Sequence, residues 1–112
     1  MLAGVAATLI MACSGGNSRS QTPLLRGLDK APDAIRSDCS LAGRKCTQCH
    51  PVERIILADV DSPAHWRRYV SRMRLQPGSN IDKGDASRIE RCLIFRTFGA
   101  DAVAAIGHGE AP

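Results

Sequence analysis

The chain has 112 residues, which leaves room for one domain with a single hydrophobic core. Its formal net charge of +4 favours acidic partners, but the excess is too small to indicate nucleic-acid binding, and no nucleic-acid motif is present. Hydrophobic residues make up 44% of the chain and aromatic residues only 4%, so the side chains alone predict a modest core. Small chains of this kind often depend on an added stabilising element.

Residues 1–12 are uncharged and mostly apolar, and Cys13 follows them directly. This pattern predicts an export signal peptide that is too short to span a membrane as a stable helix. Residues 10–13 are similar to the bacterial lipoprotein signal box, although Ile10 stands where leucine is usual and no Lys or Arg precedes Cys13. The resemblance implies an acylated Cys13 and a membrane-anchored periplasmic protein, and a plain secretory signal is the alternative.

Residues 13–32 are polar, contain Pro23 and Pro32, and show no sustained hydrophobic period. We therefore expect a tether or linker there, within which three leucines are able to form one turn against the domain. These leucines are Leu24, Leu25 and Leu28. The expected domain is 33–99, followed by a C-terminal tail over 100–112.

The first helix is expected to begin at Pro32-Asp33, which suit a first helical turn, and to run to residue 46. Apolar side chains recur at intervals of three and four residues and predict one inward-facing stripe. The stripe consists of Ala34, Ile35, Cys39 and Ala42.

The segment 46–50 reads Cys-Thr-Gln-Cys-His and has the C-x-x-C-H order of c-type haem attachment. The thiols of Cys46 and Cys49 would add to the two haem vinyl groups, and the imidazole of His50 would ligate the iron. Two intervening residues let both sulfur atoms reach one edge of the porphyrin, which places the next residue beneath its centre. We expect one covalent haem c.

Two other readings of the C-x-x-C pair are a zinc site and a dithiol redox pair. A structural zinc site needs four ligands, and no second knuckle follows Cys49. A thioredoxin-like motif belongs to a βαβ unit, whereas this segment follows a polar stretch of helical character. We therefore do not expect zinc.

The helix that ends in C-x-x-C-H resembles the N-terminal helix of class I cytochrome c, which crosses a C-terminal helix. The resemblance implies an all-α protein with a small cytochrome c fold, in which three to four helices surround one covalent haem. That family commonly has an aromatic residue four positions before the first haem cysteine, where this chain has Ala42. We expect closer or differently filled helix packing at this position.

The residues after the motif predict a turn, then an apolar run over 55–57 that would cover a haem edge. A second helix is expected to begin with Ser62 as its cap and Pro63 as its first residue, and to continue through residue 74. Trp66, Val70 and Met73 have i, i+4, i+7 spacing and lie on one face. An ordinary core stripe has the same spacing.

Met73 is the only methionine outside the predicted signal peptide. The order C-x-x-C-H followed by W-x-x-x-V-x-x-M resembles small monohaem cytochromes whose methionine ligand comes from a helix. The resemblance implies that His50 and Met73 ligate the iron and that Trp66 and Val70 contact the haem. His65 is rotated by 100° from Trp66, His108 lies in the tail, and an open or water-bound position is a further alternative.

Methionine opposite histidine favours ferrous iron and raises the potential relative to two histidine ligands. Six-coordinate iron reacts poorly with small molecules, so we expect a one-electron carrier for redox protein partners rather than an enzyme. A haem sensor or enzyme subunit with an exchangeable sixth ligand is one alternative. A thiol or zinc module without haem is the other.

Four arginines surround the second helix. They are Arg67, Arg68, Arg72 and Arg74. They could form a solvated basic face, pair with the haem propionates, or act as a docking surface near the haem edge for an acidic redox partner.

A third helix is expected to begin after Asn80 or Asp82, to continue to residue 98 and to stop at Gly99. A further turn is possible over 102–106. In the class I fold the first and last helices cross, so Cys39 and Cys92 are expected to form a disulfide in an oxidising compartment. Two separate buried thiols are the alternative.

Overall fold

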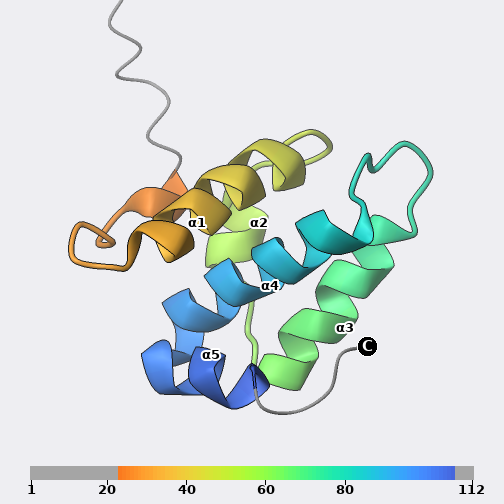
Figure 1. Ribbon diagram of the computed structural model, residues 1–112. Coiled ribbons are helices and arrows are strands. Elements are labelled where there is room, and N and C mark those ends of the chain that lie inside the picture. Colours follow the sequence, from red (N-terminus) through yellow and green to blue (C-terminus); the bar gives the residue numbers. More distant parts are fainter. Residues whose placement is uncertain (1–22, 108–112) are drawn as a thin grey trace, which may run out of the picture.

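The computed structural model describes residues 23–107, and every regular element in that range is helical (Figure 1). The elements are the short 3₁₀-helix η2 (Pro23–Leu25) and the α-helices α1 (Asp33–Cys46), α2 (Glu53–Ile56), α3 (Pro63–Arg74), α4 (Lys83–Phe98) and α5 (Ala100–Ile106). The all-α expectation is confirmed. The predicted signal peptide, Cys13 and His108 lie outside the described residues.

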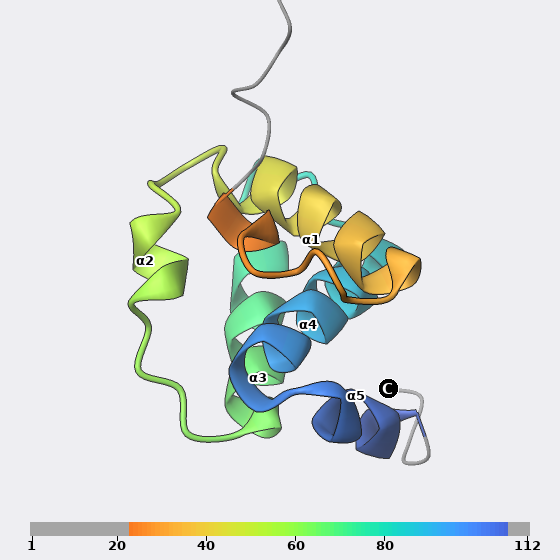
Figure 2. The same ribbon diagram turned by 90° about the vertical axis from the view of Figure 1, so that its left-hand side faces the viewer.

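Helix α4 is the central element of the fold. It packs against α1 on one side and α3 on the other, and α5 folds back against it after a turn at Gly99 (Figures 1 and 2). Helix α2 belongs to an extended connection that runs from the end of α1 to the start of α3 (Figure 2).

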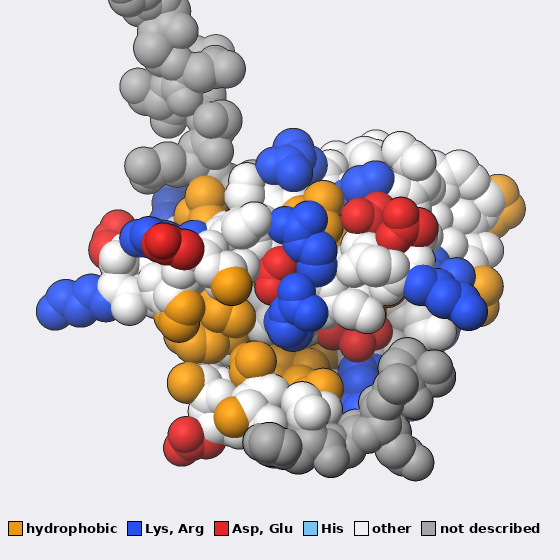
Figure 3. All heavy atoms as spheres, viewed as in Figure 1, with side chains coloured by type: hydrophobic (Ala, Val, Ile, Leu, Met, Phe, Trp, Pro, Cys, Tyr) orange, Lys and Arg blue, Asp and Glu red, His pale blue; other side chains and the backbone are white. Residues whose placement is uncertain are grey.

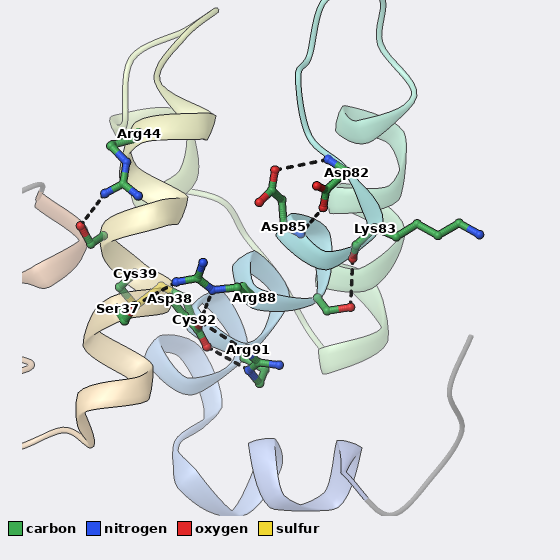
Figure 4. Close-up of polar contacts among 12 residues, drawn as sticks. Ser37, Asp38, Cys39, Arg44, Asp82, Lys83, Asp85, Arg88, Arg91 and Cys92 are labelled. Atoms are coloured by element: carbon green, nitrogen blue, oxygen red, sulfur yellow. Dashed lines mark hydrogen bonds and ion pairs between the residues drawn. A yellow bond between two sulfur atoms is a disulfide. The ribbon is translucent and has the colours of Figure 1, made fainter.

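Local capping signals fix the helix boundaries where the sequence predicts them. The Ser62 hydroxyl accepts a hydrogen bond from the backbone N–H of His65 at 3.2 Å, and Pro63 opens α3. Asp82 and Asp85 form a reciprocal capping box at the start of α4 (Figure 4). Gly99 ends α4 with a φ of 88°, a left-handed conformation that glycine adopts without strain.

Small buried side chains let α1 and α4 approach closely. Ala42 and Cys39 are both 0% exposed, and Cys92 on α4 is also 0% exposed. Cys39 and Cys92 are joined by a disulfide across Cα atoms that are 5.0 Å apart. A bridge that closes a loop of this length stabilises the fold by roughly 3–4 kcal/mol in the chain-entropy description.

The inward stripe of α1 differs from the expected one at Ala34, which is exposed. Ile35, Cys39 and Ala42 are spaced by four and three residues, and a residue one position before Ile35 is rotated by about 100° away from their face. Asp38 and Leu41 are buried instead.

The Asp38 carboxylate, which is 3% exposed, is the one charged side chain among the described residues that is buried. It accepts hydrogen bonds from Arg88 Nε at 2.8 Å and from Arg91 Nε at 2.9 Å, both on α4 (Figure 4). Figure 3 shows basic and acidic side chains interspersed over this part of the molecule. The ion pairs therefore add a polar connection between α1 and α4 next to the disulfide.

The leucines of the predicted linker form the expected turn, and two of them join the core. Leu24 is 1% exposed and Leu28 is 7% exposed. The Arg96 guanidinium on α4 donates to the carbonyl oxygens of Leu24 and Arg26. The turn is thus attached to the same core as residues 33–99. Within residues 23–107, no helix has both the length and the apolar character needed to cross a bilayer.

Candidate functional site

An apolar pocket lies between the end of α1, α2, α3 and one side of α4. It is partly open to solvent, and its exposed lining is almost entirely apolar, as in many sites for cofactors and small molecules. The pocket is lined by all six residues that the sequence assigned to cofactor binding. These are Cys46, Cys49, His50, Trp66, Val70 and Met73.

Helix α1 ends at Cys46 and so places the Cys-x-x-Cys-His segment at the pocket. The Thr47 hydroxyl donates to the Gly43 carbonyl oxygen at 2.6 Å, which closes the last turn of the helix, and Cys49 follows in the turn after it. Neither Cys46 nor Cys49 belongs to a disulfide. Burial raises the pKa of the Cys46 thiol to about 11, because the pocket wall disfavours the thiolate.

His50 is half-buried, and one nitrogen atom of its ring contacts the backbone. Its Nδ1 atom lies 3.2 Å from the carbonyl oxygen of Pro51. A carbonyl oxygen only accepts hydrogen bonds, so Nδ1 is the donor in this contact and Nε2 is the ring nitrogen left for a metal. A backbone carbonyl on one ring nitrogen is a common way to orient a histidine whose other nitrogen binds a metal.

The α3 wall of the pocket is held rigidly by Trp66. This ring is 3% exposed, and its Nε1–H donates to the Thr97 hydroxyl on α4 at 2.9 Å. With its polar atom satisfied, the indole presents apolar surface to the pocket. Val70 is buried and Met73 is half-buried on the same face of α3, as the spacing predicted.

Residues that sequence reasoning did not assign complete the lining. Ile89 and Leu93 of α4 are buried at the pocket, and Tyr69 of α3 meets Trp66 edge-on with ring centroids 6.0 Å apart. Tyr69 is three residues after Trp66, so the helical period that selected Val70 and Met73 could also have found it. The α4 residues look like ordinary core positions in the sequence.

The apolar run over 55–57 contributes to the pocket only in part. Ile55 is 8% exposed and lines the pocket, whereas Ile56 is 46% exposed and Leu57 is 79% exposed. The α2 helix is a single turn, so only one of three consecutive side chains faces inward.

His65 and the four arginines of α3 are not among the residues that line the pocket. His65 places its Nδ1 atom 3.2 Å from Asp61 Oδ1 at the surface, in agreement with its predicted rotation from Trp66. The four arginines flank a shallow groove between α3, α4 and α5 rather than the pocket. One of them, Arg72, lies over the Tyr69 ring at 5.2 Å.

The residues present fit a c-type haem. Two unpaired thiols and an imidazole stand at one end of α1, a methionine thioether comes from another helix, and most of the other lining side chains are apolar. Over residues 23–107, no three side chains of the His, Cys, Asp or Glu type gather closely enough to hold a bare metal ion. Comparison with protein families, with curated proteins and with solved structures finds no match to this chain.

Proposed function

We propose that the protein is a monohaem c-type cytochrome with a small class I-like fold that carries single electrons between redox proteins. Cys46 and Cys49 would hold the haem covalently, and His50 and Met73 would ligate its iron. The observation that carries this proposal is the convergence of a C-x-x-C-H segment and the Trp66, Val70 and Met73 face on one apolar pocket.

When bound, the haem supplies a reversible one-electron couple. The chain determines the properties of that couple. The neutral Met73 thioether favours the ferrous state, while the Pro51 carbonyl keeps the proton of His50 on Nδ1. Trp66, Ile89 and Leu93 line the pocket with buried apolar side chains, which would shield the haem from water and so limit reorganisation during transfer.

The proposed compartment is the bacterial periplasm, with export directed by residues 1–12 and attachment to the membrane through an acylated Cys13. The Cys39–Cys92 disulfide supports an oxidising compartment, because buried disulfides of this kind are rare in the cytoplasm. Redox proteins with an acidic face are the partners that the basic side chains of α3 favour.

The test is the optical spectrum and the intact mass of the purified protein and of the Met73→Ala variant. We expect a mass increment for one covalent haem in both proteins. The ferric protein should show the weak long-wavelength absorption of methionine–iron ligation, and Met73→Ala should lack it.

Other results would contradict the proposal in distinct ways. A high-spin ferric spectrum that Met73→Ala leaves unchanged would favour a sensor or enzyme with an open sixth position. The absence of a covalent mass increment would favour a thiol or zinc module.

A further inference from the structure

Lys45 lines the pocket one residue before Cys46, and its side chain makes polar contacts with residues outside α1. Its Nζ atom donates to the carbonyl oxygen of Asn80 and lies 3.2 Å from Asp85 Oδ2. The Lys45 and Asp85 side chains are only 19% and 20% exposed, so water screens this ion pair incompletely. The hydrogen bond from Lys45 is the main cause of the lowered pKa of Asp85.

One of the two partners of Lys45, Asn80, belongs to residues 75–82, which we call the rim loop. This loop begins two residues after Met73, and Gln76, Pro77, Ser79 and Ile81 line the pocket. Its conformation is held internally, because the Ser79 hydroxyl donates to the Arg74 carbonyl oxygen at 2.8 Å and its backbone N–H donates to Gln76 at 3.1 Å. A loop bonded in this way is expected to move as one unit.

Lys45 provides the polar connection between this loop and α1. Within residues 23–107, no other hydrogen bond or ion pair joins the rim loop to that helix. Lys45 is adjacent to the Cys-x-x-Cys-His segment, whereas the rim loop follows Met73, so one side chain links the two walls of the pocket.

We propose that Lys45 is a positioning residue that latches the rim loop to the end of α1 and thereby restricts exchange of the Met73 ligand. This inference rests on the proposed function. When the latch is released, the rim loop opens and a small external ligand gains access to the position that Met73 occupies. With the latch intact, the protein would be a closed electron carrier. With the latch released, it would have an exchangeable sixth position.

The experiment compares the full chain with Lys45→Met, Asp85→Asn and the double variant. Lys83→Met is the matched control, since it removes one lysine from the exposed start of α4 without touching the latch. Asp85→Asn keeps an oxygen atom that accepts from the Asp82 N–H, so the capping box survives the loss of charge.

Two measurements read the state of the latch. Hydrogen exchange at the amides of Ser79 and Ile81 reports opening of the rim loop, and the rate at which imidazole displaces Met73 in the ferric protein reports ligand exchange. We expect Lys45→Met to raise both rates about fivefold to tenfold, and Asp85→Asn to raise them less, because it leaves the hydrogen bond from Lys45 to the Asn80 carbonyl in place. The double variant should add little to Lys45→Met, because the loss of Lys45 already removes its ion pair with Asp85.

The outcomes separate this inference from the proposed function. Unchanged hydrogen exchange in Lys45→Met, or equal acceleration in Lys83→Met, would overturn the latch. Acceleration in Asp85→Asn but not in Lys45→Met would also overturn it, since the start of α4 and not Lys45 would then control the loop. A chain without covalent haem contradicts the proposed function and the role of Met73, and hydrogen exchange alone then decides whether Lys45 holds the loop.

Discussion

Cys46 and Cys49 are close in the sequence but lie in different surroundings. Cys46 is the last residue of α1 and is half-buried in the pocket wall, whereas Cys49 is exposed. Burial raises the pKa of the Cys46 thiol to about 11, so little of it is thiolate at neutral pH. The two thiols therefore differ in reactivity before any group is attached to them.

In protein produced without haem attachment, we expect iodoacetamide to modify Cys49 before Cys46 at pH 8. A thiol whose pKa is raised by about two units holds roughly a hundredfold less thiolate, so Cys46 should react at least about tenfold more slowly. Peptide mapping after timed alkylation measures both rates. Denatured protein is the control, in which the two rates should converge, and equal rates in the folded protein would contradict the described burial.

At the scale of the elements, α1 and α4 are joined by two connections of different chemistry. The disulfide between Cys39 and Cys92 constrains the unfolded chain, whereas Asp38 with Arg88 and Arg91 acts in the folded state. Because Asp38 is buried and its partners are half-exposed, the carboxylate requires both arginines to compensate for its lost hydration.

We expect Asp38→Ala to lower the free energy of unfolding by about 2 kcal/mol, because it removes three hydrogen bonds from arginine and leaves a small cavity. Chemical denaturation of the two proteins measures this difference. Asp33→Ala is the control, since it breaks an exposed pair with Arg36 on the same helix and should cost less than about 0.5 kcal/mol. Equal losses in the two variants would show that burial of Asp38 adds nothing.

Sequence reasoning succeeded for features whose cause is local. Ser62, Asp82 and Gly99 mark helix ends through bonds to residues within four positions, so a short window contains the whole signal. The buried role of Asp38 was not visible, because its arginine partners follow 50 and 53 residues later. An acidic side chain in an exposed-looking pattern gives no sign of such partners.

In the candidate site, too, residues with a local sequence pattern were predicted and residues that depend on distant contacts were not. The helical period placed Trp66, Val70 and Met73 on one face, and the structure brings that face to the same pocket as Cys46 and Cys49. Lys45 escaped prediction, because its contact with the rim loop depends on how α1 and α4 cross. The pairing of Cys39 with Cys92 came from the family resemblance and not from a local pattern.

At the scale of the whole molecule, the basic side chains of α3 and the pocket occupy different flanks of the same helix. Trp66 and Met73 line the pocket, whereas Arg67 and Arg68 line the groove beside α4 and α5. A partner with a negatively charged surface would therefore be attracted toward α3, although basic residues do not form a ring around the pocket.

We expect Arg67→Glu with Arg68→Glu to slow oxidation of the reduced protein by hexacyanoferrate(III) about tenfold at low ionic strength. Each substitution lowers the charge by two, so the pair takes the formal net charge from +4 to 0 and weakens the attraction of the anion. Stopped-flow kinetics at increasing salt measures the effect, which should fade as the Debye length shortens.

The control is Arg26→Glu with Lys30→Glu, which changes the net charge equally at the opposite end of α1 from Cys46. We expect a smaller loss of rate in this pair. If both pairs slow the reaction equally, total charge governs the encounter and the α3 surface has no special part in it.

The hydrogen bond from Arg96 to the carbonyl oxygen of Leu24 attaches the turn at Leu24 to α4 and so fixes where the chain joins the folded body. If Cys13 is acylated as proposed, the folded body lies at most roughly 35 Å from the lipid, which is the reach of a fully extended chain between Cys13 and Pro23. Such an attachment would confine the proposed electron carrier to a thin shell above the bilayer and raise its local concentration for partners in that membrane. Without the attachment, the proposed carrier would have to find its partner by diffusion in three dimensions.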